Sequence, residues 1–334
     1  MKPSYIGGQA VMEGIMMRNG AKYAVGVRKP DQEIEVKVED YRSVFGDLKL
    51  MKLPIFRGVA SFVDSLVIGT KCLMYSASFF DDEDEQSRQE KQKKYTGTQE
   101  EIRRQMEADK KKQEKRDKWL MNATMVFSVV LAVGLFMVLP YLLASLLKKI
   151  GVSEFGVTVA EAVVKMALFM GYMVLISRMK DIQRTFMYHG AEHKCINCIE
   201  NGLELTVENV MKSSRQHKRC GTSFLLLVMV ISVLMHFVFV LVPVMWLRVV
   251  GRILLIPVVA GVAFEFIRLA GKSENPVVCA VSKPGLALQK LTTREPDESM
   301  VEVAIAAVEA VFDWKTYLKE NFGYAEPESE KEAQ

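Results

Sequence analysis

The chain has 334 residues, of which 50% are hydrophobic and 25% are charged, and its formal net charge is +4. This length suffices for two domains, or for one domain joined to a membrane bundle. The small net charge gives no indication of a nucleic-acid partner, and five cysteines, an odd number, argue against a disulfide framework. The first residues, MKPSYIGGQAVMEG, lack the charged and apolar regions of a signal peptide, so we expect none.

The first part of the chain, residues 1–56, is predicted to form a small β-containing cytosolic unit. KYAVGV and EIEVKVEDY alternate as strands do, and RKPDQ between them has turn chemistry, which favours a hairpin. The preceding IGGQAVMEGIMMRNG is rich in glycine and is expected to be irregular. Residues 57–80 have helical spacing of apolar groups, but Asp64 and Lys71 disfavour a full span. We therefore expect an amphipathic helix there, at the membrane interface or packed on the bundle.

Four apolar segments are long enough to cross a bilayer as helices. They are residues 122–147, 157–177, 222–247 and 251–270. A highly charged spacer, residues 81–118, precedes them and is expected to be a solvated helix or a disordered segment. We therefore predict a mainly α-helical membrane protein with four transmembrane helices within residues 119–270.

The orientation of these segments follows from the distribution of positive charge. The connection between the second and third apolar segments, residues 178–221, carries eight Lys or Arg. Positively charged connections stay on the cytosolic side, and an even number of spans puts both termini on one side. We therefore expect residues 178–221 and both termini to be cytosolic, where basic residues near the spans suit anionic lipid headgroups.

The last part of the chain, residues 271–320, is expected to be a cytosolic segment that is broken by prolines and followed by an amphipathic helix. Apolar residues recur at helical spacing over 297–320, and Asp297 stands at the expected start of that helix as a cap. The tail, residues 321–334, is polar and acidic, and we expect it to be disordered.

The most informative motif is FMYHGAEHK, residues 186–194, which follows directly on the second apolar segment. His189 and His193 are four residues apart, so on a helix both imidazoles can reach one metal ion, with Glu192 beside them. H-x-x-E-H is the inverted form of the zinc-peptidase signature, in which the glutamate is the general base. The motif therefore predicts a site for a divalent metal, zinc above all. The alternative is a pair of polar residues hydrogen-bonded to their neighbours on a juxtamembrane helix.

Three other residues are candidates for the remaining metal ligands. His217 and Cys220 precede the third apolar segment, and both residue types bind zinc well. Glu265 lies near the end of the last apolar segment, where a charge is costly and usually functional. The alternatives are an ion pair of Glu265 with Arg268 and contact of His217 with lipid headgroups.

A second acidic residue, Glu13, lies in the glycine-rich stretch GGQAVMEG, which is neither a phosphate-binding loop nor a dinucleotide fingerprint. Paired glycines permit close approach of the backbone, which would let Glu13 act as a ligand or as an acid/base. The alternative is a tight turn that closes the small β unit.

Several blocks of the sequence together resemble the YqhQ-like family of bacterial membrane proteins, DUF1385. The blocks are GGQAVMEGIMMR at 7–18, FRGVASFVDSLVIGTKCLMYSA at 56–77, FMYHGAEHK at 186–194, HKRCGTSFL at 217–225, VAFEFIRLAG at 262–271 and PGLALQKLTTREPDESMVEVAIAA at 284–307. This family has an unknown function and has been labelled as predicted metal-dependent enzymes. The resemblance implies a multi-pass protein of the bacterial cytoplasmic membrane with a metal-dependent activity, and it gives no substrate.

Two hypotheses about function follow. The first is a metal-dependent hydrolase in which His189 and His193 bind the metal, His217, Cys220 or Glu265 completes the site, and Glu192 is the general base. The second is a noncatalytic membrane scaffold or assembly factor whose cytosolic parts bind a protein partner such as the membrane-insertion machinery or a ribosome. Membrane lipids are expected partners in both.

Overall fold

The chain is described from a computed structural model, which describes residues 2–46, 48–80, 99–238, 242, 244–271, 273 and 275–325. It consists of two compact units, one of residues 1–80 and 170–334 and the other of residues 81–169. The expectations of disorder for the beginning of the charged spacer and for the end of the tail lie outside the described residues.

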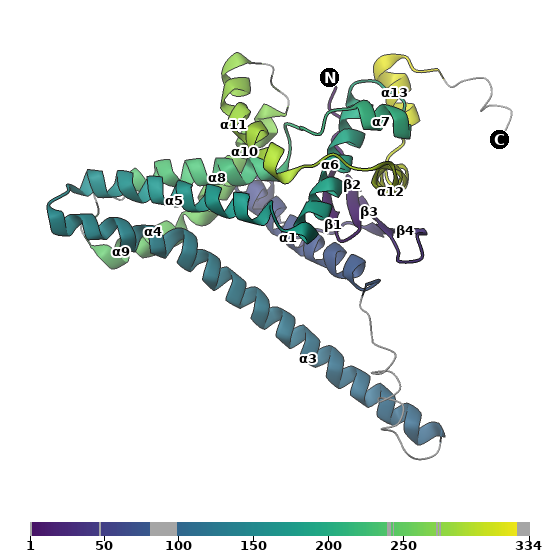
Figure 1. Ribbon diagram of the computed structural model, residues 1–334, viewed down its shortest axis with the longest axis horizontal. Coiled ribbons are helices and arrows are strands. Elements are labelled where there is room, and N and C mark those ends of the chain that lie inside the picture. The colour runs from purple at the N-terminus through teal and green to yellow at the C-terminus, as the bar shows by residue number, and fades with distance from the viewer. Residues whose placement is uncertain are drawn as a thin grey trace. The chain divides into compact units, whose positions relative to one another are not determined.

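The first unit contains a small sheet and most of the helices (Figure 1). In chain order its elements are β1 (Gly7–Val11), β2 (Gly14–Asn19), β3 (Lys22–Arg28), β4 (Ile34–Asp40), the 3-10 helix η1 (Lys49–Lys52), α1 (Phe56–Ala77), α6 (Lys180–Glu200), α7 (Val207–Lys212), α8 (Gly221–His236), α9 (Met245–Leu254), α10 (Ile256–Ala270), α11 (Pro276–Thr292), α12 (Glu298–Glu309) and α13 (Trp314–Phe322).

The second unit is entirely helical in its described part. It contains α3 (Gln99–Val133), a π-helical stretch η2 (Gly134–Val138), α4 (Leu139–Ser145), the 3-10 helix η3 (Leu146–Ile150) and most of α5 (Glu154–Ile176), which continues into the first unit. The part of the charged spacer that is described belongs to α3 and is therefore helical.

The sheet is antiparallel with the strand order β1-β2-β3-β4. The predicted hairpin is confirmed, since β3 pairs with β4. The prediction that the preceding glycine-rich stretch is irregular is wrong, because it forms β1 and β2. A Cβ on Gly8 would lie 2.7 Å from the carbonyl oxygen of Met16 and 3.0 Å from Cδ of Glu192. Glycine therefore serves here for close packing within a strand, and not for loop flexibility.

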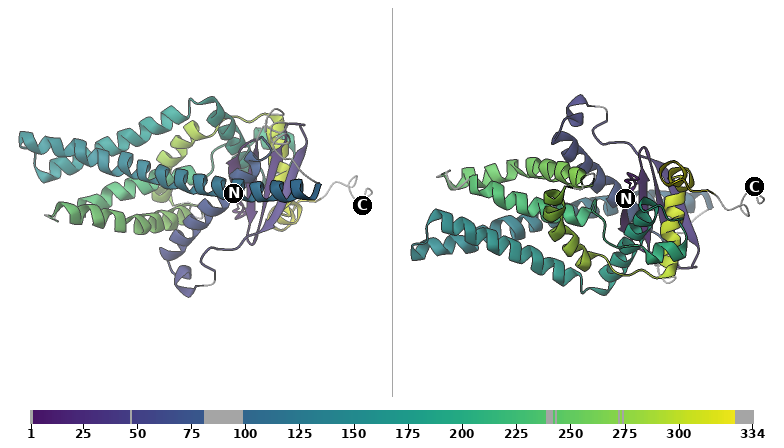
Figure 2. Two further views of the ribbon diagram at one scale, coloured as in Figure 1. Left: turned by 90° about the horizontal axis from the view of Figure 1, so that it is seen from below. Right: turned by 90° about the horizontal axis from the view of Figure 1, so that it is seen from above.

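The two faces of the sheet pack against different helices, as the views in Figure 2 illustrate. Ile15 and Met17 of β2 belong to the core shared with α6 and α12, and Met16 between them belongs to a separate cluster with Ile68 and Cys72 of α1. This division follows from the alternation of side chains along a strand. The sheet is thus buried on both sides, and β1 is held against α6.

Helix α1 joins the sheet to α10. Near its start Gly58 packs against Gly261 of α10, where a Cβ would lie 3.0 Å from the Gly261 Cα. Further along, the buried Asp64 accepts hydrogen bonds from the Tyr41 hydroxyl and, at 2.8 Å, from the Val44 amide. The carboxylate that weakened the case for a full span is therefore satisfied by the segment that follows β4.

Within the described residues, four helices are long and apolar enough to cross a membrane: Phe56–Ala77, Lys115–Ile150, Glu154–Ile176 and Val250–Ala270. Three of them overlap with predicted spans, and the first falls where we expected an interfacial helix. The predicted span 222–247 is not one helix, because α8 ends at His236 and α9 begins at Met245. The sequence between them contains a proline, which cannot donate a backbone hydrogen bond inside a helix.

The C-terminal part also differs from its prediction. The stretch expected to be broken by prolines forms the continuous helix α11, which begins with Pro276 and tolerates Pro284. A proline at the start of a helix loses no hydrogen bond, and the Asn275 side chain caps this start by accepting from the Val277 amide. The predicted cap Asp297 is confirmed, since its carboxylate accepts from the Met300 amide at 2.9 Å. The expected single helix is divided into α12 and α13.

Candidate metal centre

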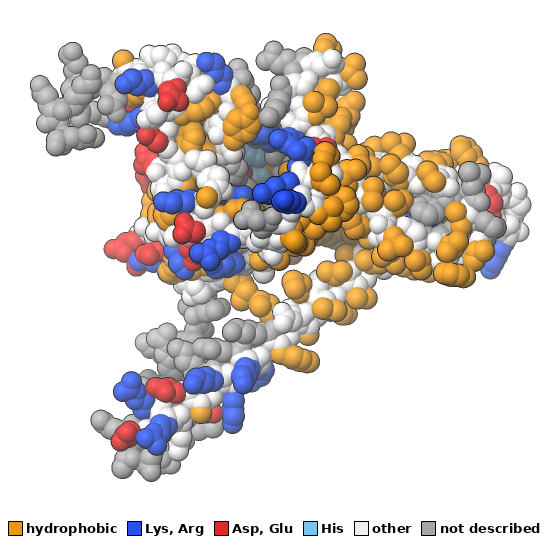
Figure 3. Space-filling view, turned by 180° about the vertical axis from the view of Figure 1, so that it is seen from behind, with side chains coloured by type: hydrophobic (Ala, Val, Ile, Leu, Met, Phe, Trp, Pro, Cys, Tyr) orange, Lys and Arg blue, Asp and Glu red, His pale blue; other side chains and the backbone are white. Residues whose placement is uncertain are grey.

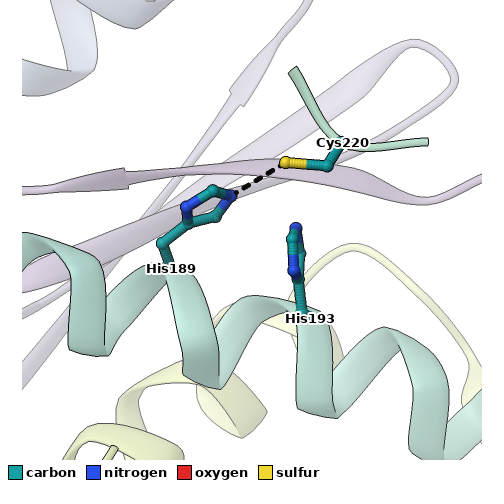
Figure 4. Close-up of side chains that lie close together, drawn as sticks. All are labelled: His189, His193 and Cys220. Atoms are coloured by element: carbon teal, nitrogen blue, oxygen red, sulfur yellow. Dashed lines mark hydrogen bonds between the residues drawn. The ribbon is translucent and has the colours of Figure 1, made fainter. Parts of the chain in front are cut away.

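Three potential metal ligands converge between α6 and the start of α8. The side chains are His189, His193 and Cys220, and one ligand atom of each lies within 4.8 Å of the others (Figure 4). The Cys220 sulfur is 3.3 Å from Nε2 of His189, and the two imidazole rings are 4.4 Å apart between centroids. The prediction that 186–194 is helical and brings both histidines to one face is therefore confirmed.

Both imidazoles are oriented by backbone carbonyl groups. Nδ1 of His189 lies 2.8 Å from the Thr292 carbonyl oxygen, and Nδ1 of His193 lies 2.7 Å from the Arg215 carbonyl oxygen. A carbonyl can only accept, so each Nδ1 carries a proton and Nε2 is the ring atom left to bind a metal. Metal-binding histidines typically have this second hydrogen bond, which fixes the tautomer and the ring. The donor set of two imidazole nitrogens and one cysteine sulfur therefore fits zinc.

The presence of a glycine between the two histidines is explained by sterics. A Cβ on Gly190 would lie 2.0 Å from the carbonyl oxygen of Arg294, and the Arg294 amide donates to the Phe186 carbonyl at 2.9 Å. The segment after α11 is thereby pressed against the helix turn that carries His189. Glycine weakens a helix in isolation, but here it permits the contact that places the Thr292 carbonyl against the imidazole.

Glu192 is buried on α6 between the two histidines, and one of its oxygens, Oε2, has no hydrogen-bond partner among the described residues. Burial raises the pKa of Glu192 to about 6, while His189 and the backbone of Gly8 oppose the rise. An unpaired buried carboxylate oxygen is costly, and functional sites are where such costs are found. Glu192 is therefore available to accept a proton at a position one residue from a candidate ligand.

His217 is placed next to the cluster but is bonded elsewhere. Its Nε2 lies 3.4 Å from Glu200 Oε2, and its ring is 5.8 Å from that of His193. Burial would raise the pKa of Glu200, but the hydrogen bond from His217 and the charge of Arg219 lower it to about 2. Burial in turn lowers the pKa of His217. This buried network holds the segment before α8 against the end of α6.

The two other predicted acidic residues lie in ion pairs. Glu13, in the turn between β1 and β2 with φ of 47°, pairs with Arg184 and lies 3.4 Å from the Tyr188 hydroxyl. Glu265 pairs with Arg57 of α1, which is neither the ligand role nor the pair with Arg268 that the sequence suggested. The structure therefore does not bring Glu13 or Glu265 to the cluster of His189, His193 and Cys220.

Two cysteines on α6 also lie outside the cluster of His189, His193 and Cys220. Cys195 and Cys198 are buried, and burial raises the pKa of the Cys195 thiol well above its usual value and that of Cys198 to about 11. Thiols with raised pKa values are poor nucleophiles and poor ligands. Both side chains belong to the core between α6, the sheet and α12.

Sequence reasoning missed the backbone groups that build the site. Lys194 donates to the Met211 carbonyl at 2.7 Å, and Asn197 donates to the Ser214 carbonyl at 2.6 Å. Gln289 of α11 bonds both the amide and the carbonyl of His217, at 2.9 and 2.8 Å. These polar residues on α6 and α11 could have been noticed as candidates, but the carbonyl groups that they hold carry no signal in the sequence.

Comparisons with known proteins identify the family of the chain. The model of a family described as "Protein of unknown function (DUF1385)" matches residues 53–314. The chain is 34% identical over 326 residues to a protein of Bacillus subtilis (strain 168) named "Uncharacterized protein YqhQ", covering 96% of this chain and 95% of that protein. No solved structure matches the chain. The chain belongs to the DUF1385 family and is YqhQ-like.

Proposed function

We propose that this chain is an integral protein of the bacterial cytoplasmic membrane that hydrolyses its substrate at a zinc site facing the cytosol. The apolar helices are exposed on their outer faces, as membrane helices are: Ile256 and Leu269 of α10 are 45% and 53% exposed. The excess of Lys and Arg in residues 178–221 supports a cytosolic position for the segment that carries the site.

In this proposal, His189 and His193 bind the metal through Nε2, and Cys220 binds it as a thiolate. Three protein ligands are the number found in catalytic zinc sites, where the ion acts as a Lewis acid. The carbonyl groups of Thr292 and Arg215 keep both imidazoles in the binding tautomer. His217 takes no part in binding and braces the segment that carries Cys220.

Glu192 acts as the general base. It accepts a proton from the attacking water through Oε2, which no described residue hydrogen-bonds, while the Gly8 backbone donates to the same carboxylate. The observation that carries the proposal is the convergence of His189, His193 and Cys220 from two separate segments of the chain.

The test is the metal content of detergent-purified full-length protein, measured by elemental mass spectrometry. We expect close to one zinc per chain in the wild type, and loss of most of it in His193→Ala and Cys220→Ser. Cys279→Ser is the matched control, because this cysteine is partly exposed on α11 and lies outside the cluster. Metal-free protein after purification without chelator contradicts the proposal.

Glu192→Gln separates binding from catalysis. As the general base, Glu192 is dispensable for the metal and essential for function, so the variant should keep its zinc and fail to restore a strain that lacks the protein. Full restoration by Glu192→Gln, with zinc bound, contradicts a hydrolase.

Full restoration by Glu192→Gln would favour a noncatalytic role, which one observation supports. The cluster joins α6 to the residues around Cys220, so a metal there would clamp two segments of the same unit together. In a scaffold or assembly factor that clamp would stabilise a cytosolic surface for a protein partner, and Glu192→Gln would behave as the wild type.

A further inference from the structure

A pocket with a positively charged lining lies beside the candidate metal centre. Its volume is about 490 Å³, and it is lined by Arg215, Lys290 and Arg294 together with Glu295, Ser177 and two apolar side chains, Met187 and Leu291. Pockets of this size hold small organic ligands. In Figure 3, Lys and Arg side chains gather around a recess in which histidine is visible.

The pocket is built from the segments that orient the two histidines. The carbonyl of Arg215 lies against Nδ1 of His193, and the carbonyl of Arg294 lies where Gly190 lacks a side chain. The backbone of both arginines is therefore fixed against the same two turns of α6. Their guanidinium groups line the pocket, so a ligand held there lies next to the turns that carry His189 and His193.

The charges at this pocket favour an anion. Glu295 contributes one negative charge, but it pairs with the buried Lys194 at 2.9 Å, and a longer contact of 3.5 Å joins it to Arg215. Three cationic side chains therefore line the pocket with one carboxylate, and that carboxylate is already paired with a fourth cation, Lys194. Arg294 donates one hydrogen bond, to the Ser177 carbonyl at 3.0 Å, and a guanidinium has five N–H groups.

A phosphate group matches this set of donors. Guanidinium forks bind phosphate oxygens in pairs, and a lysine ammonium adds a point charge. The pocket also includes Ser177, directly after the membrane-length helix α5, which is the level of lipid headgroups if α5 spans.

We propose that Arg215, Lys290 and Arg294 bind the phosphate group of the substrate, which is a membrane phospholipid or a soluble phosphate ester. This inference rests on the proposed function, because it assigns the substrate class of that site. The arginines and the lysine hold the phosphate beside the turns of α6 that carry His189 and His193.

The test is phosphate binding by full-length protein that has been stripped of metal with a chelator, so that the metal itself contributes nothing. Inorganic phosphate is titrated calorimetrically, and phosphatidic acid in detergent micelles is followed by native mass spectrometry. Lys290→Ala and Arg294→Gln are compared with Lys283→Ala, a matched control that is exposed on the same helix and does not line the pocket.

We expect at least about tenfold weaker binding in Lys290→Ala and Arg294→Gln, since each removes a charged hydrogen-bond partner. Lys283→Ala should bind within about twofold of the wild type. Binding of phosphatidic acid alone identifies a lipid, and binding of inorganic phosphate as well identifies a soluble ester; both results support the proposal. The proposal is overturned if neither probe binds, or if Lys283→Ala loses as much affinity as Lys290→Ala and Arg294→Gln.

The zinc content of untreated samples is measured in parallel and separates the two proposals. Zinc without phosphate binding overturns the substrate class and leaves the metal site in place. Phosphate binding that depends on Lys290, in a wild type that never carries metal, overturns the hydrolase and leaves an anion site. If Arg294→Gln fails to fold, the exposed Lys290 provides the readout.

Discussion

Helix α6 buries polar residues, whereas helix α10 exposes apolar residues. The second half of α6 is buried throughout, although it contains Glu192, His193, Lys194, Asn197 and Glu200. Helix α10 is almost entirely apolar, yet much of its surface is exposed. Polar groups are buried at a cost and are kept inside where they bind or hold something. The contrast fits a site held by α6 within the protein, whereas α10 has the exposed apolar surface of a helix that is able to cross a membrane.

The largest expected effect comes from breaking the buried charge network at the end of α6. Glu200 accepts hydrogen bonds from the Ser4 amide, at 2.7 Å, and from Arg219. Glu200→Ala would leave Arg219 uncompensated and should lower the free energy of unfolding by about 3–5 kcal/mol. Glu208→Ala is the control, since Glu208 forms an exposed pair with Lys212 and its loss should change the stability little. Denaturant unfolding in detergent measures both, and equal losses would contradict a special role for Glu200.

A matched pair of isoleucines tests the contrast more directly. Ile196 of α6 is 2% exposed, and Ile256 of α10 is 45% exposed. Ile196→Ala should cost about 2–5 kcal/mol of unfolding free energy through the cavity that it leaves. Ile256→Ala in detergent should cost less than about 1 kcal/mol, because that side chain packs mainly against its surroundings. A large loss at Ile256 would show that α10 has a protein partner on its outer face.

Gly190 is expected to have an intermediate effect. Gly190→Ala pushes a methyl group into the Arg294 carbonyl and should cost about 1–3 kcal/mol, while displacing the carbonyl that orients His189. Gly171→Ala is the control, because a Cβ there meets nothing within 4 Å and alanine favours the helix. Unfolding and zinc content are measured together. Gly190→Ala with wild-type stability and full zinc would refute the close approach.

The smallest expected effect is the pH dependence of stability that arises from the protonation of Glu200. Its pKa is about 2 in the folded protein and near 4.5 when unperturbed. A lowered pKa stabilises the fold above the unfolded value, and this contribution is lost as the pH falls from about 4.5 toward 2. The stability difference between wild type and Glu200→Gln should therefore be constant from pH 5 to 8 and shrink between pH 4.5 and 3. A difference that grows on acidification would have the wrong sign.

The sequence predicted the parts of the fold that depend on local pattern. The hairpin of β3 and β4, the helix through His189 and His193, and the Asp297 cap each follow from residues close together in the chain. The glycine-rich strands β1 and β2 were not predicted. Gly8 allows close contact with Met16 and Glu192, and contacts between segments that are distant in the chain leave no periodic pattern in the sequence.

The candidate site was predictable in part for the same reason. The spacing of His189 and His193 indicates a shared face, whereas the selection of Cys220 over His217 and Glu265 depends on tertiary packing. Glu265 is charged and close to the end of an apolar helix, but its partner Arg57 lies more than two hundred residues away in the chain. Sequence alone could name the candidates and could not choose among them.

The central claim is that His189, His193 and Cys220 bind one zinc ion, and X-ray absorption at the zinc edge tests it most directly. Purified wild-type protein should show nitrogen scatterers at about 2.0–2.1 Å and one sulfur at about 2.3 Å. In Cys220→Ser the sulfur contribution should disappear. A zinc environment without sulfur in the wild type, or one whose sulfur persists in Cys220→Ser, would contradict the site.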